Sequence, residues 1–297
     1  MNQRKNNNTI LVPTDFSDVA NNALNHALKV ADKYNNEITL LYVMEEVGFL
    51  GAIFGGTDKT DLIKEAIDGR LNKLIEEAKK AYPKIVINKL IESGKVYEVV
   101  TEIANNGPYD SIIMGTNGAS GLKQIVGSNS SRVINYAQIP VIVVKEKTIG
   151  SGYKKIVVPI DLTRESRQKL TWAVHVAKKF DSTLHIIYEN TTNQEFRSKI
   201  GAVVNQTQNI LDEHNVSYIV RGLDDEKYPD SFAEDTLAYA SEIDADLIII
   251  MSQQERGFSE YLLGSYAQQI VNHSNIVPVM CISSNDAGVI LQGVFSS

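Results

Sequence analysis

The first half of the chain holds a glycine-rich stretch whose residue types are suited to binding phosphate groups. Gly115 and Gly118 follow an apolar run, and Gly127, Ser128 and Asn129 open a predicted helix shortly afterwards. Glycine lets backbone N–H groups approach a phosphate closely and tolerates positive φ angles. The N-terminus of a helix adds free N–H donors and the favourable end of the helix dipole. This stretch therefore predicts an anion site.

Two other segments of the same half end in residues suited to a nucleoside. Asp15 follows the apolar run 10–12, and Val43 follows the apolar run 38–42. A carboxylate accepts hydrogen bonds from ribose hydroxyls, while Val43 offers backbone groups and an apolar wall to a base. Each residue also has a plainer explanation, because Asp15 is placed to cap the next helix and Val43 to join the core. Their combination in one sheet favours a nucleotide site.

An internal repeat identifies the elements that must position these residues. Five segments of the first half recur in the same order in the second half, which argues for two copies of one domain. The matched segments are 10–15 with 156–161, 38–42 with 184–188, 109–114 with 245–250, 127–128 with 264–265, and 139–144 with 277–282.

The matched runs are short, apolar and rich in Ile and Val, as in parallel strands covered on both faces. Between these runs, apolar residues recur with the spacing of a helix. The first such segment places Ala20, Ala23 and Leu24 on one helix face, with Ser17 as the N-cap. Further helices are predicted at 59–81, 95–106, 129–137, 195–214, 230–242 and 266–273, with third strands at 85–91 and 216–220. The fold class expected is α/β, with two tandem doubly wound five-stranded parallel sheets and helices on both faces. Ligands of such sheets bind at the carboxyl ends of the strands.

The chain divides naturally between the two copies. We expect a first domain at 1–148 and a second at 149–297, with a C-terminal tail after about residue 284. The linker 145–153 contains Gly150, Ser151 and Gly152, which supply flexibility.

Composition excludes several classes of partner. The net charge is −7 and the isoelectric point is near 5.3, so neither a nucleic-acid surface nor a polybasic membrane anchor is expected. No stretch approaches the roughly 20 apolar residues of a membrane span, and residues 1–8 lack the apolar region of a signal peptide. The single cysteine, Cys281, sits in an apolar run and is expected to be a packed thiol. These features predict a cytoplasmic protein.

With these motifs in place, the chain resembles a tandem universal stress protein over about 9–145 and 153–283. ATP-binding members carry Gly, two residues, Gly, nine residues, Gly, then Ser or Thr, an order that Gly115, Gly118, Gly127 and Ser128 match. The resemblance implies the strand order 3-2-1-4-5 and pairing through strand five, here 141–144 with 279–282, as a pseudo-dimer within one chain. It implies ATP as the ligand, with or without Mg²⁺ or Mn²⁺. The nucleotide positions that it implies are Pro13, Thr14, Asp15, Val43, Met114, Gly115, Gly118, Gly127, Ser128 and Asn129.

Two departures from that pattern bear on function. The stretch between Gly118 and Gly127 has eight residues, one fewer than the family pattern. In the second copy the two glycines of the first motif are replaced by Met251 and Gln254, and Val43 is matched by Glu189. Side chains at the glycine positions crowd a phosphate path, and a carboxylate against a base wall is costly. We therefore predict that the second copy is a partner domain that binds no nucleotide.

The leading hypothesis is a stress-response protein that binds ATP or a related adenine nucleotide in the first copy as a regulatory ligand. One alternative is a slow ATPase or autokinase, for which Lys123 and Arg132 are the nearest cations. Another is a scaffold with both sites degenerate, which the shortened loop favours. A dinucleotide oxidoreductase ranks below these, because residues 13–16 lack the glycine turn it needs.

Other polar and apolar features carry no assigned chemistry. The five histidines lack metal-ligand spacing, and ordinary packing or surface roles are expected for them. No catalytic triad or metal site is predicted. The apolar loop 47–56 is interpreted as a segment that packs against the second copy, with a lid or partner-binding role as the alternative. The association of two whole chains into a homodimer and the role of the tail are left open.

Overall fold

Within each copy, the strands and helices of the described residues alternate. The computed structural model describes residues 8–45, 57–116, 128–146, 152–163, 165–224, 231–252 and 265–283. The first copy comprises β1 (Thr9–Pro13), α1 (Asp18–Tyr34), β2 (Glu37–Met44), α3 (Thr57–Ala81), β3 (Ile87–Ser93), α4 (Val96–Asn106), β4 (Tyr109–Gly115), α5 (Ser128–Tyr136) and β5 (Val141–Val144). The second comprises β6 (Lys155–Pro159), α6 (Glu165–Phe180), β7 (Thr183–Asn190), α7 (Gln194–Glu213), β8 (Tyr218–Asp224), α8 (Phe232–Glu242), β9 (Leu247–Met251), α9 (Ser265–His273) and β10 (Val279–Ile282).

The helices predicted from periodicity are confirmed to within about two residues at each end. Ser17 caps α1 as expected, because its side chain accepts a hydrogen bond from the Ala20 amide at 3.3 Å. The predicted starts of the third strands are too early: β3 begins at Ile87 and β8 at Tyr218. At the end of α7, Asn215 has a φ of 53° and the Val216 amide still bonds to a helical carbonyl, so the chain becomes extended only afterwards.

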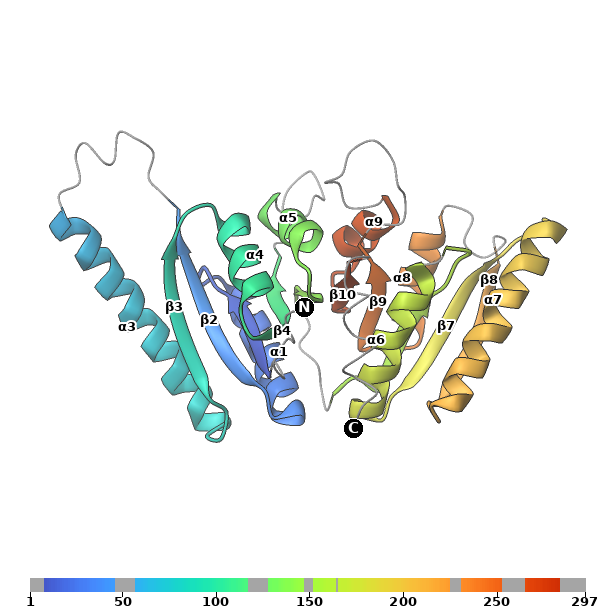
Figure 1. The fold of residues 1–297 in the computed structure, drawn as a ribbon, viewed down its shortest axis with the longest axis horizontal. Coiled ribbons are helices and arrows are strands. Elements are labelled where there is room, and N and C mark those ends of the chain that lie inside the picture. Colours follow the sequence, from blue (N-terminus) through green and yellow to red (C-terminus); the bar gives the residue numbers. More distant parts are fainter. Residues whose placement is uncertain are drawn as a thin grey trace.

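The ten strands of the described residues form one sheet in the order β3-β2-β1-β4-β5-β10-β9-β6-β7-β8. Each half has the order 3-2-1-4-5 with parallel neighbours, as the resemblance implied. The halves meet where β10 pairs antiparallel with β5, Met280 lying opposite Ile142. The expected pairing through strand five is therefore confirmed, and in Figure 1 α3 and α7 lie at the outer ends with α5 and α9 beside the centre.

Two hydrophobic cores cover the sheet, one on each face. Neighbouring strand residues point to opposite faces, so Ile10 and Val12 join the core beneath α1, α3, α6 and α7, while Leu11 joins the core beneath α4, α5, α8 and α9. Each core contains residues of both copies. Cys281 lies in the second core, and burial raises the pKa of its thiol, so the expected packed thiol is confirmed.

An aromatic cluster joins the copies on the first face. The Phe180 ring of α6 packs edge-on against Tyr34 of α1 at 5.0 Å and against Tyr153 at 4.7 Å between centroids. The Tyr153 hydroxyl is in turn hydrogen-bonded to His26 Nε2 at 2.5 Å. Tyr153 is only 2% exposed, so this end of the predicted linker is part of the core instead of a flexible tether.

The other end of the predicted linker is also packed. Lys145 Nζ donates to the Asn272 carbonyl at 2.7 Å, at the C-terminal end of α9, where a cation is favoured by the helix dipole. Asn22 of α1 donates to the Lys145 carbonyl at 3.0 Å. Both ends of segment 145–153 are therefore packed, and for residues 147–151, which lie outside the described part of the chain, flexibility stays a prediction.

The buried His26 predicts a specific pH dependence of stability. Burial, reinforced by the positive charge of Lys29, lowers the pKa of His26 from 6.5 to about 3. Between these values the unfolded chain binds a proton that the folded chain does not, so the free energy of unfolding falls as the pH decreases through this range. We expect His26→Phe to reduce that fall, measured by urea unfolding between about pH 7 and pH 4.5.

Tyr153→Phe is the matched control. It removes the same hydrogen bond but leaves the imidazole buried, so it is expected to lower stability by about 1 kcal/mol at every pH while keeping the slope of the wild-type chain. Equal slopes for His26→Phe and the wild type would contradict a buried neutral imidazole.

Candidate functional site

The ends of β1 and β2 bring Asp15 beside Val43. Pro13 is paired with Leu41 in the parallel ladder, and the Thr14 amide continues it by donating to the Leu41 carbonyl at 2.9 Å. Continued by two residues, this register places Asp15 next to Val43, which is half-buried on β2. The carboxylate and the apolar side chain expected for a nucleoside therefore lie side by side at the carboxyl edge.

On the other side of β1, the end of β4 adds a buried hydroxyl. Leu11 pairs with Ile112, and the same register continued to the carboxyl edge places Thr116 next to Asp15. Thr116 is 2% exposed, and its Oγ1 has no hydrogen-bond partner within the described residues. The strand order reverses between β1 and β4, which is the switch point where ligands of doubly wound sheets bind.

The turn from β1 to α1 is tied by its own side chains. Asp15 Oδ1 accepts from the Ser17 amide at 2.9 Å, and Thr14 Oγ1 accepts from the Phe16 amide at 3.1 Å. Phe16 has a positive φ of 65°. These two hydrogen bonds therefore hold a left-handed backbone conformation that residues other than glycine rarely adopt. The plainer expectation that Asp15 caps α1 is wrong, because Ser17 is the N-cap and Asp15, which is exposed, accepts from the amide of that cap residue.

Gly115 is required by close packing. A Cβ atom at this position would lie 2.5 Å from the Val19 carbonyl oxygen and 2.9 Å from the Ala20 nitrogen, because the first turn of α1 rests on the end of β4. In the second copy the matching residue is Met251, whose side chain is fully buried in the core. A methionine there is incompatible with the approach of helix to strand seen in the first copy.

The remaining predicted residues fall into three groups. Met114 is 6% exposed and its side chain belongs to the core, so only its backbone is available to a ligand, and Pro13 is half-buried within β1. Asn129 is half-buried in the first turn of α5, the helix that begins at Ser128. The residues outside the described part of the chain are Gly118, Gly127, Lys123, the loop 47–56, and the tail after 283.

A cation that the sequence analysis did not single out lies beside the first site. The Arg70 guanidinium of α3 sits 4.0 Å above the Phe16 ring, and that ring is stacked on Tyr42 at 5.0 Å. Phe16 and Tyr42 are the chain neighbours of Asp15 and Val43. No feature of the sequence distinguishes Arg70 from the other charged residues of α3.

The second copy presents different groups at the same edge. Glu189 takes the place of Val43 and is exposed at the end of β7, while Tyr266 takes the place of Asn129 and is half-buried against the second core. The Tyr266 hydroxyl lies 2.9 Å from Thr236 Oγ1. Asp161, the counterpart of Asp15, accepts from the Thr163 amide at 2.8 Å, so the capping of the following turn is common to both copies.

Comparison with known proteins accounts for this repeated architecture. The family model described as the universal stress protein family matches residues 6–145 and again 152–283. The chain belongs to the universal stress protein family.

Single relatives and solved structures agree with that assignment. Universal stress protein MJ0531 of Methanocaldococcus jannaschii is 36% identical over 140 residues, which span 46% of this chain and 81% of the relative. Universal stress protein MJ0577 of the same organism is 33% identical over 153 residues, spanning 46% of this chain and 94% of the relative. A solved universal stress protein from Archaeoglobus fulgidus matches 93% of this chain and 96% of its own, with a TM-score of 0.74 at 22% identity, which supports the fold.

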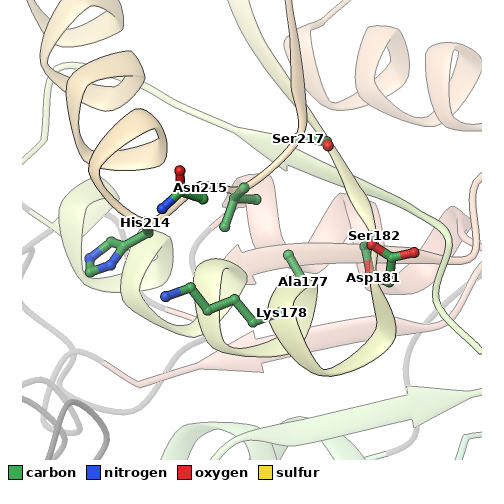
Figure 2. A pocket seen from close by; sticks show the side chains of 8 residues that line it. Ala177, Lys178, Asp181, Ser182, His214, Asn215 and Ser217 are labelled. Atoms are coloured by element: carbon green, nitrogen blue, oxygen red, sulfur yellow. The ribbon is translucent and has the colours of Figure 1, made fainter.

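A cavity of about 240 Å³ opens at the opposite edge of the sheet of this universal stress protein. It lies at the amino ends of β7 and β8, and Figure 2 shows Lys178 and His214 lining it. Ligands of doubly wound sheets bind at the carboxyl edge, so the cavity is separate from the candidate site. The complete lining is Ala177, Lys178, Asp181, Ser182, His214, Asn215, Val216 and Ser217.

Histidines and acidic residues of this universal stress protein form no metal cluster within the described ranges. His185 Nδ1 lies 2.8 Å from the Tyr239 hydroxyl, and His26 is hydrogen-bonded to the Tyr153 hydroxyl. Both histidines therefore have the packing role expected for them. No helix in the described part of the chain is both long and apolar enough to cross a membrane.

The contact between Gly115 and α1 predicts a position-specific cost. Gly115→Ala is expected to lower the free energy of unfolding by about 1–3 kcal/mol, because the backbone of Val19 must move to admit a methyl group. Urea unfolding monitored by circular dichroism measures the change.

Gly69→Ala serves as the control for helix and glycine effects. Gly69 lies inside α3, and a Cβ atom added there would have no neighbour within 4 Å, so alanine is expected to stabilise the chain by roughly 0.5–1 kcal/mol. A neutral or stabilising Gly115→Ala would show that α1 does not rest on β4 as described.

Proposed function

We propose that this universal stress protein binds ATP or a related adenine nucleotide at the carboxyl edge of its first copy, as a regulatory ligand. The observation that carries the proposal is the buried Thr116 hydroxyl, which has no hydrogen-bond partner among the described residues. A buried polar atom without a partner costs about 1–3 kcal/mol, so a polar ligand at this point is favoured. Thr116 ends β4, directly before the glycine-rich stretch.

The neighbouring residues fit the parts of a nucleotide. Asp15 is exposed beside Thr116 and is held in place by the Ser17 amide, so its carboxylate is oriented to accept from ribose hydroxyls. Val43, on the far side of Asp15, offers an apolar wall for the base. In this proposal the phosphates lie toward Gly118 and Gly127 and the N-terminus of α5, where Ser128 and Asn129 add amide donors.

The proposal assigns the nucleotide to the domain 1–148 and none to the domain 149–297. Met251 replaces Gly115 and Glu189 replaces Val43, so the second copy lacks both the glycine and the apolar wall. A divalent cation, if it accompanies ATP, would be held mainly by the phosphates, because the described residues offer no ligand cluster of their own.

A slow ATPase or autokinase is the alternative within the same site. Phosphoryl transfer needs a positive group near the transferred phosphate. Arg132, one of the two cations considered for that role, is held 4.7 Å above the Tyr97 ring on α4. This contact favours a ligand that is bound and released over one that is hydrolysed.

Calorimetric titration of nucleotide-stripped protein with ATP and Mg²⁺ tests the proposal. We expect about one ATP per chain with a dissociation constant on the order of micromolar. Asp15→Ala and Gly118→Val are each expected to weaken binding by at least roughly tenfold, through loss of the ribose acceptor and obstruction of the phosphate path.

Asp161→Ala is the matched control, because Asp161 holds the same position in the second copy. It is expected to leave ATP affinity unchanged. Absence of ATP binding in the wild type, or equal losses in Asp15→Ala and Asp161→Ala, would refute the assignment to the first copy. Metal-dependent release of phosphate that disappears in Gly118→Val would instead identify the hydrolytic alternative.

A further inference from the structure

The second copy buries a lysine where the first copy has an alanine. Lys169 of α6 matches Ala23 of α1 in the repeat and is fully buried. Within the described residues its Nζ has no hydrogen-bond partner. A buried ammonium group has three donors to satisfy and is costly without acceptors, so this position calls for an explanation.

The ammonium group belongs to the carboxyl edge of the sheet. Lys169 lies one turn from the start of α6, which begins at Glu165 and follows β6. Side chains in a helix tilt toward its N-terminus, so the lysine extends toward the edge where Asp161 lies. Burial lowers the pKa of Lys169 to about 8 although the charge of Asp161 opposes the decrease, which indicates that these two groups are near each other.

A second polar atom without a partner lies at the same edge. Val157 of β6 pairs with Ile248 of β9, and this register continued to the carboxyl ends places Asp161 opposite Ser252. Ser252 is 1% exposed, and its Oγ has no hydrogen-bond partner in the described part of the chain. The unsatisfied hydroxyl of Ser252 therefore lies at the end of β9 beside Asp161, whose charge acts on the unsatisfied ammonium of Lys169.

Asp161 does not satisfy the lysine. Its Oδ1 accepts from both the amide and the hydroxyl of Thr163, at 2.8 and 2.5 Å. Asp161 offsets part of the charge of Lys169 without forming a hydrogen bond to it. The ammonium donors therefore lack acceptors among the described residues, and an oxygen-rich anion is the chemical group that supplies them.

We propose that the second copy binds a small oxyanion of the phosphate class between Lys169 Nζ and Ser252 Oγ. The N-terminus of α9, which begins at Ser265, faces the same edge and adds amide donors. The exposed Glu189 and the half-buried Tyr266 occupy the positions of Val43 and Asn129, so this edge favours a small free anion over a nucleoside. This site is independent of the nucleotide proposed for the first copy.

Calorimetric titration with inorganic phosphate tests the site, in a Gly118→Val background that obstructs the first copy. Lys169→Met keeps the apolar stem and removes the charge. It is expected to weaken phosphate binding at least about tenfold, because a charge-assisted hydrogen bond is lost. It is also expected to raise the melting temperature in phosphate-free buffer, because the buried charge disappears.

Asp161→Asn is expected to change phosphate affinity in the opposite direction from Lys169→Met. The amide still accepts from Thr163, but the negative charge beside the anion is removed, so phosphate binding is expected to tighten severalfold. AMP is expected not to displace phosphate. Phosphate affinity that is absent, or is unchanged in Lys169→Met, would overturn the site, and displacement by AMP with equal affinity would overturn its restriction to free anions.

Discussion

The antiparallel ladder between β5 and β10 is the contact on which the rest of the molecule depends. Each of these strands would otherwise end its sheet with a row of unpaired backbone groups, an arrangement that proteins avoid. Their pairing turns two five-stranded sheets into one of ten strands and aligns α1 with α6 across the centre. The contacts of Tyr34 with Phe180 and of Lys145 with Asn272 both follow from that alignment. Each of the two hydrophobic cores is continuous across this contact and contains residues of both copies.

Local sequence patterns were sufficient to predict the elements of this fold. A strand buried on both faces has no alternative to an apolar run, so β1, β4 and their counterparts were evident, and Ser17 identified the start of α1. The starts of the third strands at the sheet's edges were predicted two residues too early, because Ile85 and Val216 are apolar but precede the strands. Apolar character alone does not distinguish an edge strand from the buried turn before it.

Contacts between distant elements were harder to predict than the elements themselves. The row of Val43, Asp15 and Thr116 follows from parallel register and was expected in outline, although the buried hydroxyl was not. The contact of Arg70 with Phe16 could not be predicted, because Phe16 is distant in sequence and lies in a turn whose positive φ has no sequence pattern. Lys169 can be recognised in the sequence, because it interrupts the apolar face of its helix at the position that Ala23 occupies in the first copy.

Covalent joining of the two copies has a consequence for how the sites change over time. In an assembly of two identical chains, every substitution appears twice, so a change that damages one site damages both. In this chain the two copies are different segments of one sequence, so each can change without the other. Met251 and Lys169 therefore alter one carboxyl edge while Gly115 and Ala23 leave the other intact. A single chain thus holds two different versions of the same sheet edge, free of the constraint that symmetry imposes.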